Sequence, residues 1–353
     1  MAQRSGVPVA RMAAFCKTQH LPERCGEWGR ENLGLSMGPS CGHTPSLMRL
    51  ATLQALVAAV EEGSLRGASR RVGASQPALS KMIRELELEL AVPLLMRTSR
   101  GVIPTAQGKV LYDHAVKVSR ELVSAVDTIQ QLGGQMVGQL HVGAVPLAVM
   151  LLIPETLRTF GQAFPNIRLR ISEELYIAQL QRLRAGEVDL MVGGVPDDLS
   201  RGEFTIERLT NTEMVPTARN GSPWLKARTM ADLQDAKWVY TSPNAESGYA
   251  RQWYEQHGLP PPRVGAVVNS TLALLSLVAA GDCVALMPRQ IALQPIMQAH
   301  MSIIEVHERG LPLEVGVMVR SDAAMSPAIR HFIAHLHRAA HQLEVASASV
   351  LGV

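Results

Sequence analysis

The stretch GASQPALSKMIRELE, residues 73–87, has the pattern of a capped amphipathic helix. Ser75 stands where a side-chain oxygen can accept a backbone N–H of the first turn, and Pro77 falls where a helix needs no backbone donor. Apolar residues then recur at helical spacing and form one stripe, at Leu79, Met82, Ile83, Leu86 and Leu90. We therefore predict a helix that runs through the alternating segment ELELEL and ends before Pro93.

Another face of this helix carries hydrogen-bonding side chains rather than charge alone. Gln76, Ser80 and Arg84 follow one another at intervals of four residues, with Pro77 and Lys81 beside them. Gln and Arg side chains each make paired hydrogen bonds to purine edges in the major groove of DNA. For a helix taken alone, a solvated polar face is the simpler interpretation. The neighbouring segments decide between the two.

Two shorter helices precede this stretch. Apolar residues at helical spacing begin after Met48 and stop at Gly63. Ser64 is placed to cap a second helix that ends at Val72. Three helices within about forty residues, joined by short turns, are typical of a helix-turn-helix.

A short hairpin is predicted after the third helix, in LLMRTSRGVIPT, residues 94–105. Its Arg97 and Arg100 are placed to reach phosphates or a minor groove, and such contacts position a protein without specifying sequence. Residues 48–107 therefore predict an all-α winged helix-turn-helix that binds DNA, and the solvated-face interpretation becomes the weaker one.

A long helix is predicted from residue 105 to residue 133. Its apolar positions alternate in steps of four and three, at Leu111, Ala115, Val118, Leu122, Ala125, Ile129 and Leu132. A heptad seam of this kind packs along another long helix rather than onto a globular core. A second copy of the same chain is the simplest partner.

From Gln139 onward, short apolar strands alternate with amphipathic helices up to a last helix that begins at Ser326. The predicted strands include FTIERL and EMVPTA as two separate elements, and the predicted helices include 151–164 and ADLQDA. Two similar runs of strand and helix predict an α/β domain over residues 138–345, with two subdomains and a cleft between them.

Composition limits the remaining choices. The 34 basic and 31 acidic residues leave a net charge of +3, which is too small to indicate a nucleic-acid partner for the chain as a whole. No run approaches the ~18 apolar residues of a membrane span, and the N-terminus lacks the pattern of an export signal. We therefore expect a cytoplasmic protein with no membrane partner. Residues 1–47 show neither helical nor strand periodicity and are expected to be an unstructured extension, or the product of a misassigned start.

Four alternative interpretations are not favoured by the sequence. GPSCG, residues 38–42, fits a nucleophile elbow of a hydrolase, but no strand precedes it, so an enzyme is not expected. The candidate ligands of a zinc site are Cys16, His20, Cys25, Cys41 and His43. Their spacing matches no common zinc module, so no metal is expected.

The histidines of the last helix, His331, His335, His337 and His341, are expected to face solvent, opposite a core face of Ile329, Phe332, Ile333 and Leu336. Redox sensing would need a partner for Cys283, which we expect to be a small buried core residue. A periplasmic solute-binding protein would suit the C-terminal half alone, but neither the missing export signal nor the helix-turn-helix favours it.

From Met48 to about Leu343 the chain resembles the LysR-type transcriptional regulators. The most specific part is GSLRGASRRVGASQPALSKMIRELELELAVPLLMRTSRGVIPTAQG, residues 63–108. The sequences of the wing and of the effector domain look most like those of the branch that includes regulators of sugar-binding-protein and aromatic-sulfonate genes. The resemblance implies a homodimer, usually assembled into a homotetramer, that binds an inverted-repeat promoter site and responds to a small effector. No cofactor is implied beyond that effector, and RNA polymerase is a candidate partner.

The resemblance also implies a periplasmic-binding-protein-like effector domain, with subdomain I at about 138–212 and 313–343 and subdomain II at about 213–312. By position, the residues implied to contact DNA are Gln76, Pro77, Ser80, Lys81, Arg84, Arg97 and Arg100. Those implied to contact the effector are Val145, Pro146, Gly193, Gly194, Thr241, Ser242, Asn269, Ser270 and Thr271. Helix N-termini and free backbone N–H groups there would favour an anion. Val145 stands where many members of the family have Ser or Thr, so one hydroxyl contact is missing.

Overall fold

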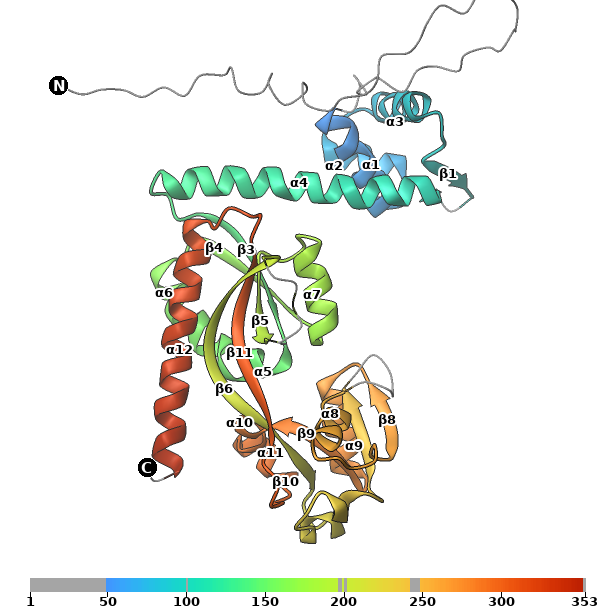
Figure 1. The fold of residues 1–353 in the computed structure, drawn as a ribbon. Coiled ribbons are helices and arrows are strands. Elements are labelled where there is room, and N and C mark those ends of the chain that lie inside the picture. The colour runs from blue at the N-terminus through green and yellow to red at the C-terminus, as the bar shows by residue number, and fades with distance from the viewer. Residues whose placement is uncertain (1–48, 100, 196–198, 200–201, 242–247, 352–353) are drawn as a thin grey trace, which may run out of the picture. The chain divides into compact units, whose positions relative to one another are not determined.

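The computed structural model describes residues 49–99, 101–195, 199, 202–241 and 248–351 (Figure 1). The predicted extension, its cysteines and GPSCG lie outside these residues, as do Arg100 and Ser242. Within the described part of the chain, no helix combines the length and the apolar character needed to cross a membrane.

The N-terminal part of the described chain is a winged helix-turn-helix. Its elements are α1 (Leu50–Glu62), α2 (Leu65–Val72), α3 (Gln76–Leu90), β1 (Leu95–Thr98) and β2 (Gly101–Pro104). The predicted caps are confirmed: the Ser64 hydroxyl accepts the N–H of Gly67, and the Ser75 hydroxyl accepts the N–H of Ala78. Gly63 ends α1 with a positive φ of 60°, a conformation that glycine adopts without strain. The ELELEL segment is helical, as predicted.

A 27-residue helix, α4 (Ala106–Leu132), follows the wing. Thr105 caps it, because its hydroxyl accepts the N–H of Gly108 at 2.9 Å and donates to the carbonyl of Pro93 at 2.7 Å. One hydroxyl therefore fixes both the start of the long helix and the chain that precedes the wing.

The C-terminal part is built on one nine-stranded sheet in the order β4-β3-β5-β11-β6-β9-β7-β8, with β10 paired to β6. The strands are β3 (Gly138–Ala144), β4 (Ile167–Glu173), β5 (Leu190–Gly194), β6 (Phe204–Arg219), β7 (Lys237–Thr241), β8 (Val264–Val268), β9 (Cys283–Pro288), β10 (Met301–Ile303) and β11 (Leu311–Arg320). The helices are α5 (Pro146–Leu151), α6 (Ile153–Ala163), α7 (Tyr176–Arg184), α8 (Tyr249–Gln256), α9 (Thr271–Ala280), α10 (Arg289–Ala292), α11 (Pro295–Gln298) and α12 (Pro327–Leu351).

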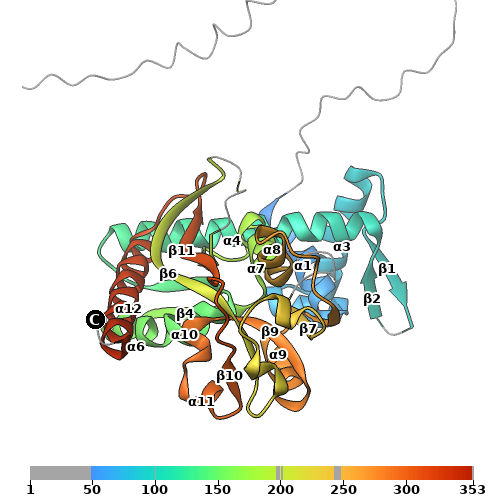
Figure 2. The same cartoon turned by 60° about the horizontal axis from the view of Figure 1, so that its bottom comes forward.

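The two long strands β6 and β11 run side by side through this domain (Figures 1 and 2). They pair antiparallel from Leu311 opposite Met214 to Arg320 opposite Phe204, with a bulge between Val315 and Gly316. The prediction of two separate strands was wrong here, because FTIERL and EMVPTA form the single strand β6. The polar residues between them stay in the strand since β11 satisfies their backbone groups along this length.

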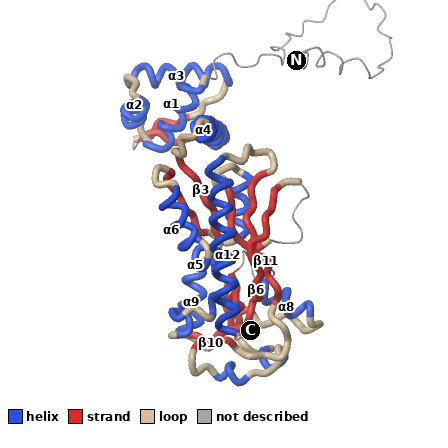
Figure 3. Tube along the Cα trace, turned by 90° about the vertical axis from the view of Figure 1, so that its left-hand side faces the viewer, coloured by secondary structure: helices blue, strands red, loops and turns tan. Residues whose placement is uncertain are grey.

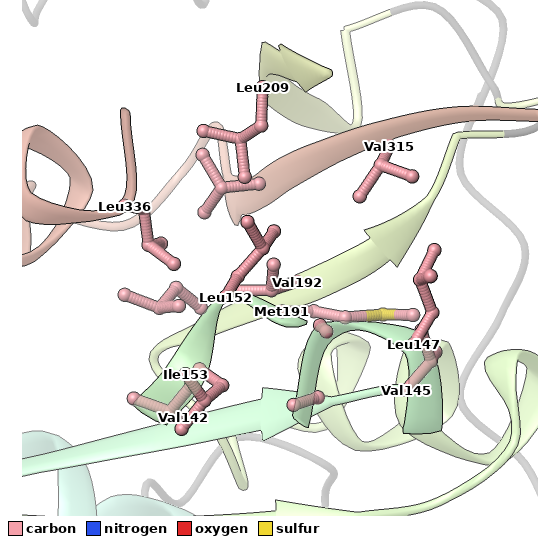
Figure 4. Close-up of a cluster of buried hydrophobic side chains, with 14 of the residues drawn as sticks. Val142, Val145, Leu147, Leu152, Ile153, Met191, Val192, Leu209, Val315 and Leu336 are labelled. Atoms are coloured by element: carbon pink, nitrogen blue, oxygen red, sulfur yellow. The ribbon is translucent and has the colours of Figure 1, made fainter. Parts of the chain in front are cut away.

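Two hydrophobic cores flank the sheet. The larger one contains residues of β3, β5, α5 and α12, including Val142, Val145, Met191, Val192 and Leu336, which converge in Figure 4. Helix α12 packs against α6 and β6 (Figure 3). The smaller core is aromatic: Trp238, Trp253 and Tyr254 are buried with edge-to-face ring contacts.

Other differences from the predicted elements have local causes. The helix predicted from residue 151 begins at Ile153, and a separate helix, α5, precedes it. Pro154 lacks the N–H that would extend α5, and as the second residue of α6 it needs none. Residues ADLQDA form only a three-residue 3-10 helix, Ala231–Leu233. Cys283 is half-buried at the start of β9 rather than fully buried.

Candidate DNA-binding surface and effector cleft

Helix α3 and the wing enclose a hollow of about 560 Å³. We call it the α3–wing hollow. Five of the seven predicted DNA contacts line it: Pro77, Ser80, Lys81, Arg84 and Arg97. Gln76 is exposed at the first position of α3 but does not line the hollow. Buried Leu79, Ile83 and Leu86 turn the apolar stripe of α3 inward, so the polar face remains open.

The cations of the hollow are available to a ligand. Lys81 lies 3.7 Å from Glu85 on the same helix with its side chain 76% exposed, a pair worth little in water. Neither Arg84 nor Arg97 forms an ion pair with any residue that the structure describes. Arg71 differs, because its guanidinium bonds Glu61 at 2.5 Å, and this hydrogen bond raises the pKa of Arg71. Arg71 therefore joins α2 to α1, whereas Arg84 and Arg97 are free to contact phosphate or bases.

Glu87 fixes the wing against α3. Its carboxylate accepts the backbone N–H groups of Leu94 and Leu95, at 2.8 and 3.1 Å. This residue also lines the hollow, and the sequence pattern did not predict a role for it. Because both donors are at the start of β1, Glu87 sets the spacing between the base-facing side of α3 and Arg97.

Helix α4 presents the predicted heptad seam to solvent over much of its length. Its exposed apolar residues include Val118, Leu122 (45% exposed), Ile129 (69% exposed) and Leu132, whereas Ala115 is buried. The end of α4 is held to the C-terminal domain by Gln131, whose amide donates to the carbonyl of Val137 at 2.9 Å and accepts the N–H of Ala328 at 3.1 Å. The exposed seam therefore has no partner within the described part of the chain, as expected of an oligomerisation helix.

A second hollow, of about 600 Å³, lies where α7 and α8 approach β5, β6 and β11. We call it the α7–α8 cleft. Its polar lining residues are Tyr176, Asn211, Thr212, Tyr249, Gln252 and Glu314, and its apolar ones include Gly194, Val195, Leu311 and Leu313. The volume is typical of a small-molecule site, which usually measures about 300–1,000 Å³.

The structure places some of the predicted effector residues together, but not all of them. A Cβ on Gly193 would lie 2.8 Å from Cγ1 of Val145, so these two residues are in contact, and Gly194 lines the α7–α8 cleft. The N–H of Val145 donates to the carbonyl of Val192 at 3.0 Å, and Pro146 follows as the first residue of α5. The backbone donor of Val145 is therefore already used.

The remaining predicted effector residues lie elsewhere. Thr241 lines a smaller hollow next to Gly248 and Tyr249. Ser270 caps α9 by accepting the N–H of Ala273, while Asn269 is exposed and Thr271 is half-buried. Asn269, Ser270 and Thr271 are not among the described residues that line the α7–α8 cleft.

Most cleft residues that the sequence pattern did not predict lie on α7, α8, β6 and β11. Tyr176 and Tyr249 are the first residues of α7 and α8, and Asn211 and Thr212 lie in the middle of β6. Burial raises the pKa of Tyr249, so its hydroxyl stays a protonated donor at neutral pH. The only local signal was an aromatic residue at the start of each helix, and this pattern is too common to identify a site.

Comparison with known proteins decides the family. Residues 50–109 match the bacterial regulatory helix-turn-helix protein, lysR family, and residues 133–341 match the LysR substrate binding domain. The chain belongs to the LysR family of transcriptional regulators. This LysR regulator is 27% identical to the HTH-type transcriptional regulator GbpR of Azospirillum brasilense over 83% of this chain and 86% of that protein. It is 30% identical to the SDS degradation transcriptional activation protein of a Pseudomonas species, over 79% of this chain and 92% of that protein.

The same fold occurs in the solved LysR regulator CbnR, with a TM-score of 0.63 and 20% identity over 83% of this chain and 99% of CbnR. CbnR has also been solved in complex with its target DNA. These relatives confirm the predicted family, the suggested branch and the two-part fold. The protein is thus a DNA-binding transcriptional regulator with an effector-binding domain, and it is not an enzyme.

Proposed function

We propose that this LysR regulator reads promoter DNA with α3 lying in the major groove. Gln76, Ser80 and Arg84 contact base edges, Pro77 packs beside them, and Lys81, Arg97 and Arg100 contact phosphates. The observation that carries this assignment is the α3–wing hollow, in which Arg84 and Arg97 are both unpaired among the described residues. Contacts of two kinds, to bases and to backbone, come from one rigid surface because Glu87 holds the wing to the helix.

The exposed seam of α4 supports a dimer, and a two-fold dimer would match an inverted-repeat site with one half-site for each helix-turn-helix. We further propose assembly into a tetramer and contact with RNA polymerase at the promoter. Since the target is promoter DNA, the proposed location is the cytoplasm.

We propose that the effector binds in the α7–α8 cleft, close to Gly193 and Gly194. The two faces of this cleft come from different parts of the chain, because Gly194 ends β5 whereas Tyr249 begins α8. A ligand that bridges them would change the angle between the two subdomains, and binding energy of this kind shifts a conformational equilibrium. We propose no cofactor in addition to the effector.

The test is an electrophoretic mobility shift with DNA from upstream of the protein's own gene. We expect a specific complex at nanomolar protein, competed by the same DNA but not by scrambled DNA, with affinity that falls steeply as salt rises. Equal competition by both DNAs would contradict base reading by α3. Footprinting of the shifted complex then tests the inverted repeat.

A further inference from the structure

The charge of the α7–α8 cleft indicates what kind of effector it takes. Among its lining residues that the structure describes, Glu314 is the one carboxylic acid, and none is a lysine or an arginine. Glu314 is engaged by Arg208, with 2.8 Å between its carboxylate and Nε. The polar groups left on the walls are amides and hydroxyls.

Two arginines on neighbouring elements, Arg251 and Arg289, are also paired. Arg251, which precedes Gln252 on α8, bonds Glu255 at 2.7 Å. Arg289, at the start of α10, bonds Glu213 of β6. An anion entering the cleft would therefore meet the carboxylate of Glu314 without an uncommitted described cation to offset it.

Two positions that the sequence offered to an anion supply no free backbone donor, because the N–H of Val145 donates to the carbonyl of Val192 and Pro146 has no N–H. The Ser270 hydroxyl accepts the N–H of Ala273 at the start of α9, and Ser270 does not line the α7–α8 cleft. By contrast, the hydroxyl of Tyr249 and the side-chain amides of Asn211 and Gln252 make no hydrogen bond to another described residue. These three groups are uncharged, and together they both donate and accept.

We infer that the effector is an uncharged, hydroxyl-rich small molecule, of the carbohydrate or polyol class, held by hydrogen bonds to Asn211, Tyr249 and Gln252. Amides and a phenol match hydroxyl groups because each partner can donate and accept. Tyr176 and Tyr249 also offer ring faces against which the C–H groups of such a ligand can pack. This inference rests on the proposed function in that it takes the α7–α8 cleft as the effector site.

The test compares ligands that differ only at C6. Calorimetric titration of the full-length protein uses D-glucose and D-galactose, and D-glucuronate and D-galacturonate, which keep the ring hydroxyls of these sugars but carry a carboxylate in place of the C6 hydroxymethyl group. We expect at least one neutral sugar to bind, and its uronate to bind at least tenfold more weakly. Asn211→Ala and Tyr249→Phe should each weaken binding of the sugar by about two- to tenfold, as for loss of one neutral hydrogen bond. Gln256→Ala, exposed at the end of α8, is the matched control and should bind like the wild type.

Glu314→Gln tests the electrostatic part of the inference. It frees Arg208, so binding of the uronate should strengthen while that of the neutral sugar changes little. A uronate that binds the wild type more tightly than its sugar, or a panel in which no sugar binds, overturns the inference. If uronate binding is lost in Asn211→Ala, the cleft remains the effector site and only the charge assignment fails. If sugar binding survives both Asn211→Ala and Tyr249→Phe, the proposed site itself is wrong.

Discussion

Replacing Arg84 by Ala tests base reading most directly. Arg84 is exposed on α3 and has no ion pair within the described residues, so its loss should leave the fold intact. The free energy lost therefore belongs to the complex with DNA. A paired contact from an arginine to guanine contributes about 1–3 kcal/mol of discrimination, which corresponds to a roughly 5- to 150-fold weaker Kd on the specific site.

The assay is fluorescence anisotropy with a specific and a scrambled duplex, from 50 to 200 mM salt. Arg84→Ala should lose most of its affinity on the specific duplex and little on the scrambled one. Lys81→Ala, one turn away, should weaken both about equally and lower the salt slope by about 1, as expected for one phosphate contact. Arg84→Lys keeps the charge and should still lose specificity, because lysine lacks the paired geometry.

Two outcomes would refute this reasoning. Equal losses on both duplexes for Arg84→Ala would show that this side chain contacts phosphate and not bases. A normal affinity for Arg84→Ala would place the reading surface elsewhere on α3. Arg170→Ala, an exposed change on β4 in the C-terminal domain, is the charge-matched control and should bind both duplexes like the wild type.

Three further predictions follow from single contacts. A Cβ on Gly108 would lie 1.9 Å from the carbonyl oxygen of Leu94, so Gly108→Ala should destabilise the DNA-binding part by about 3 kcal/mol in chemical denaturation; Gly161→Ala, which meets nothing within 4 Å, should not. Leu122→Glu places charge on the exposed seam of α4 and should shift the protein to monomers in sedimentation, whereas Lys117→Glu, off the seam, should leave the oligomer intact. Burial, with Arg338 and His331 nearby, lowers the pKa of His335. The neutral ring therefore stabilises the fold at pH values above its ordinary pKa of about 6.5. This stability is lost as the pH falls through the lowered pKa. The drop in melting temperature between pH 7 and pH 5 should therefore be smaller in His335→Gln, and an unchanged drop would contradict the assignment.

Local chemistry explains what could be predicted from the sequence. Ser64, Ser75 and Thr105 act within three residues of their own position, so spacing alone located three helix starts. The expectation that His335 faces solvent was wrong, because its ring packs edge-on to Phe160 and bonds Thr159 at 2.8 Å. That contact joins α12 to α6, and the periodicity of a single helix does not predict which helix packs against it.

The cleft was harder to predict for the same reason. Asn211 and Gln252 are polar residues in ordinary surroundings along the chain, and only the approach of α8 to β6 makes them neighbours. The continuous strand β6 was missed because its centre is polar, and polar residues between apolar ones are typical of a turn. What kept the strand intact was pairing with β11, which follows about a hundred residues later in the chain.

That pairing decides how the C-terminal domain can respond mechanically. A strand that serves both subdomains leaves no flexible loop on this side to act as a hinge, so a change of angle has to be an elastic bend of the ribbon formed by β6 and β11. The bulge at Val315 and Gly316 is where such a ribbon yields most easily, since one residue there is already out of register. The same ribbon ends at Arg320, which lies 3.8 Å from Glu121 of α4. Bending of this ribbon thus reaches α4, the helix that we propose joins two copies of the regulator.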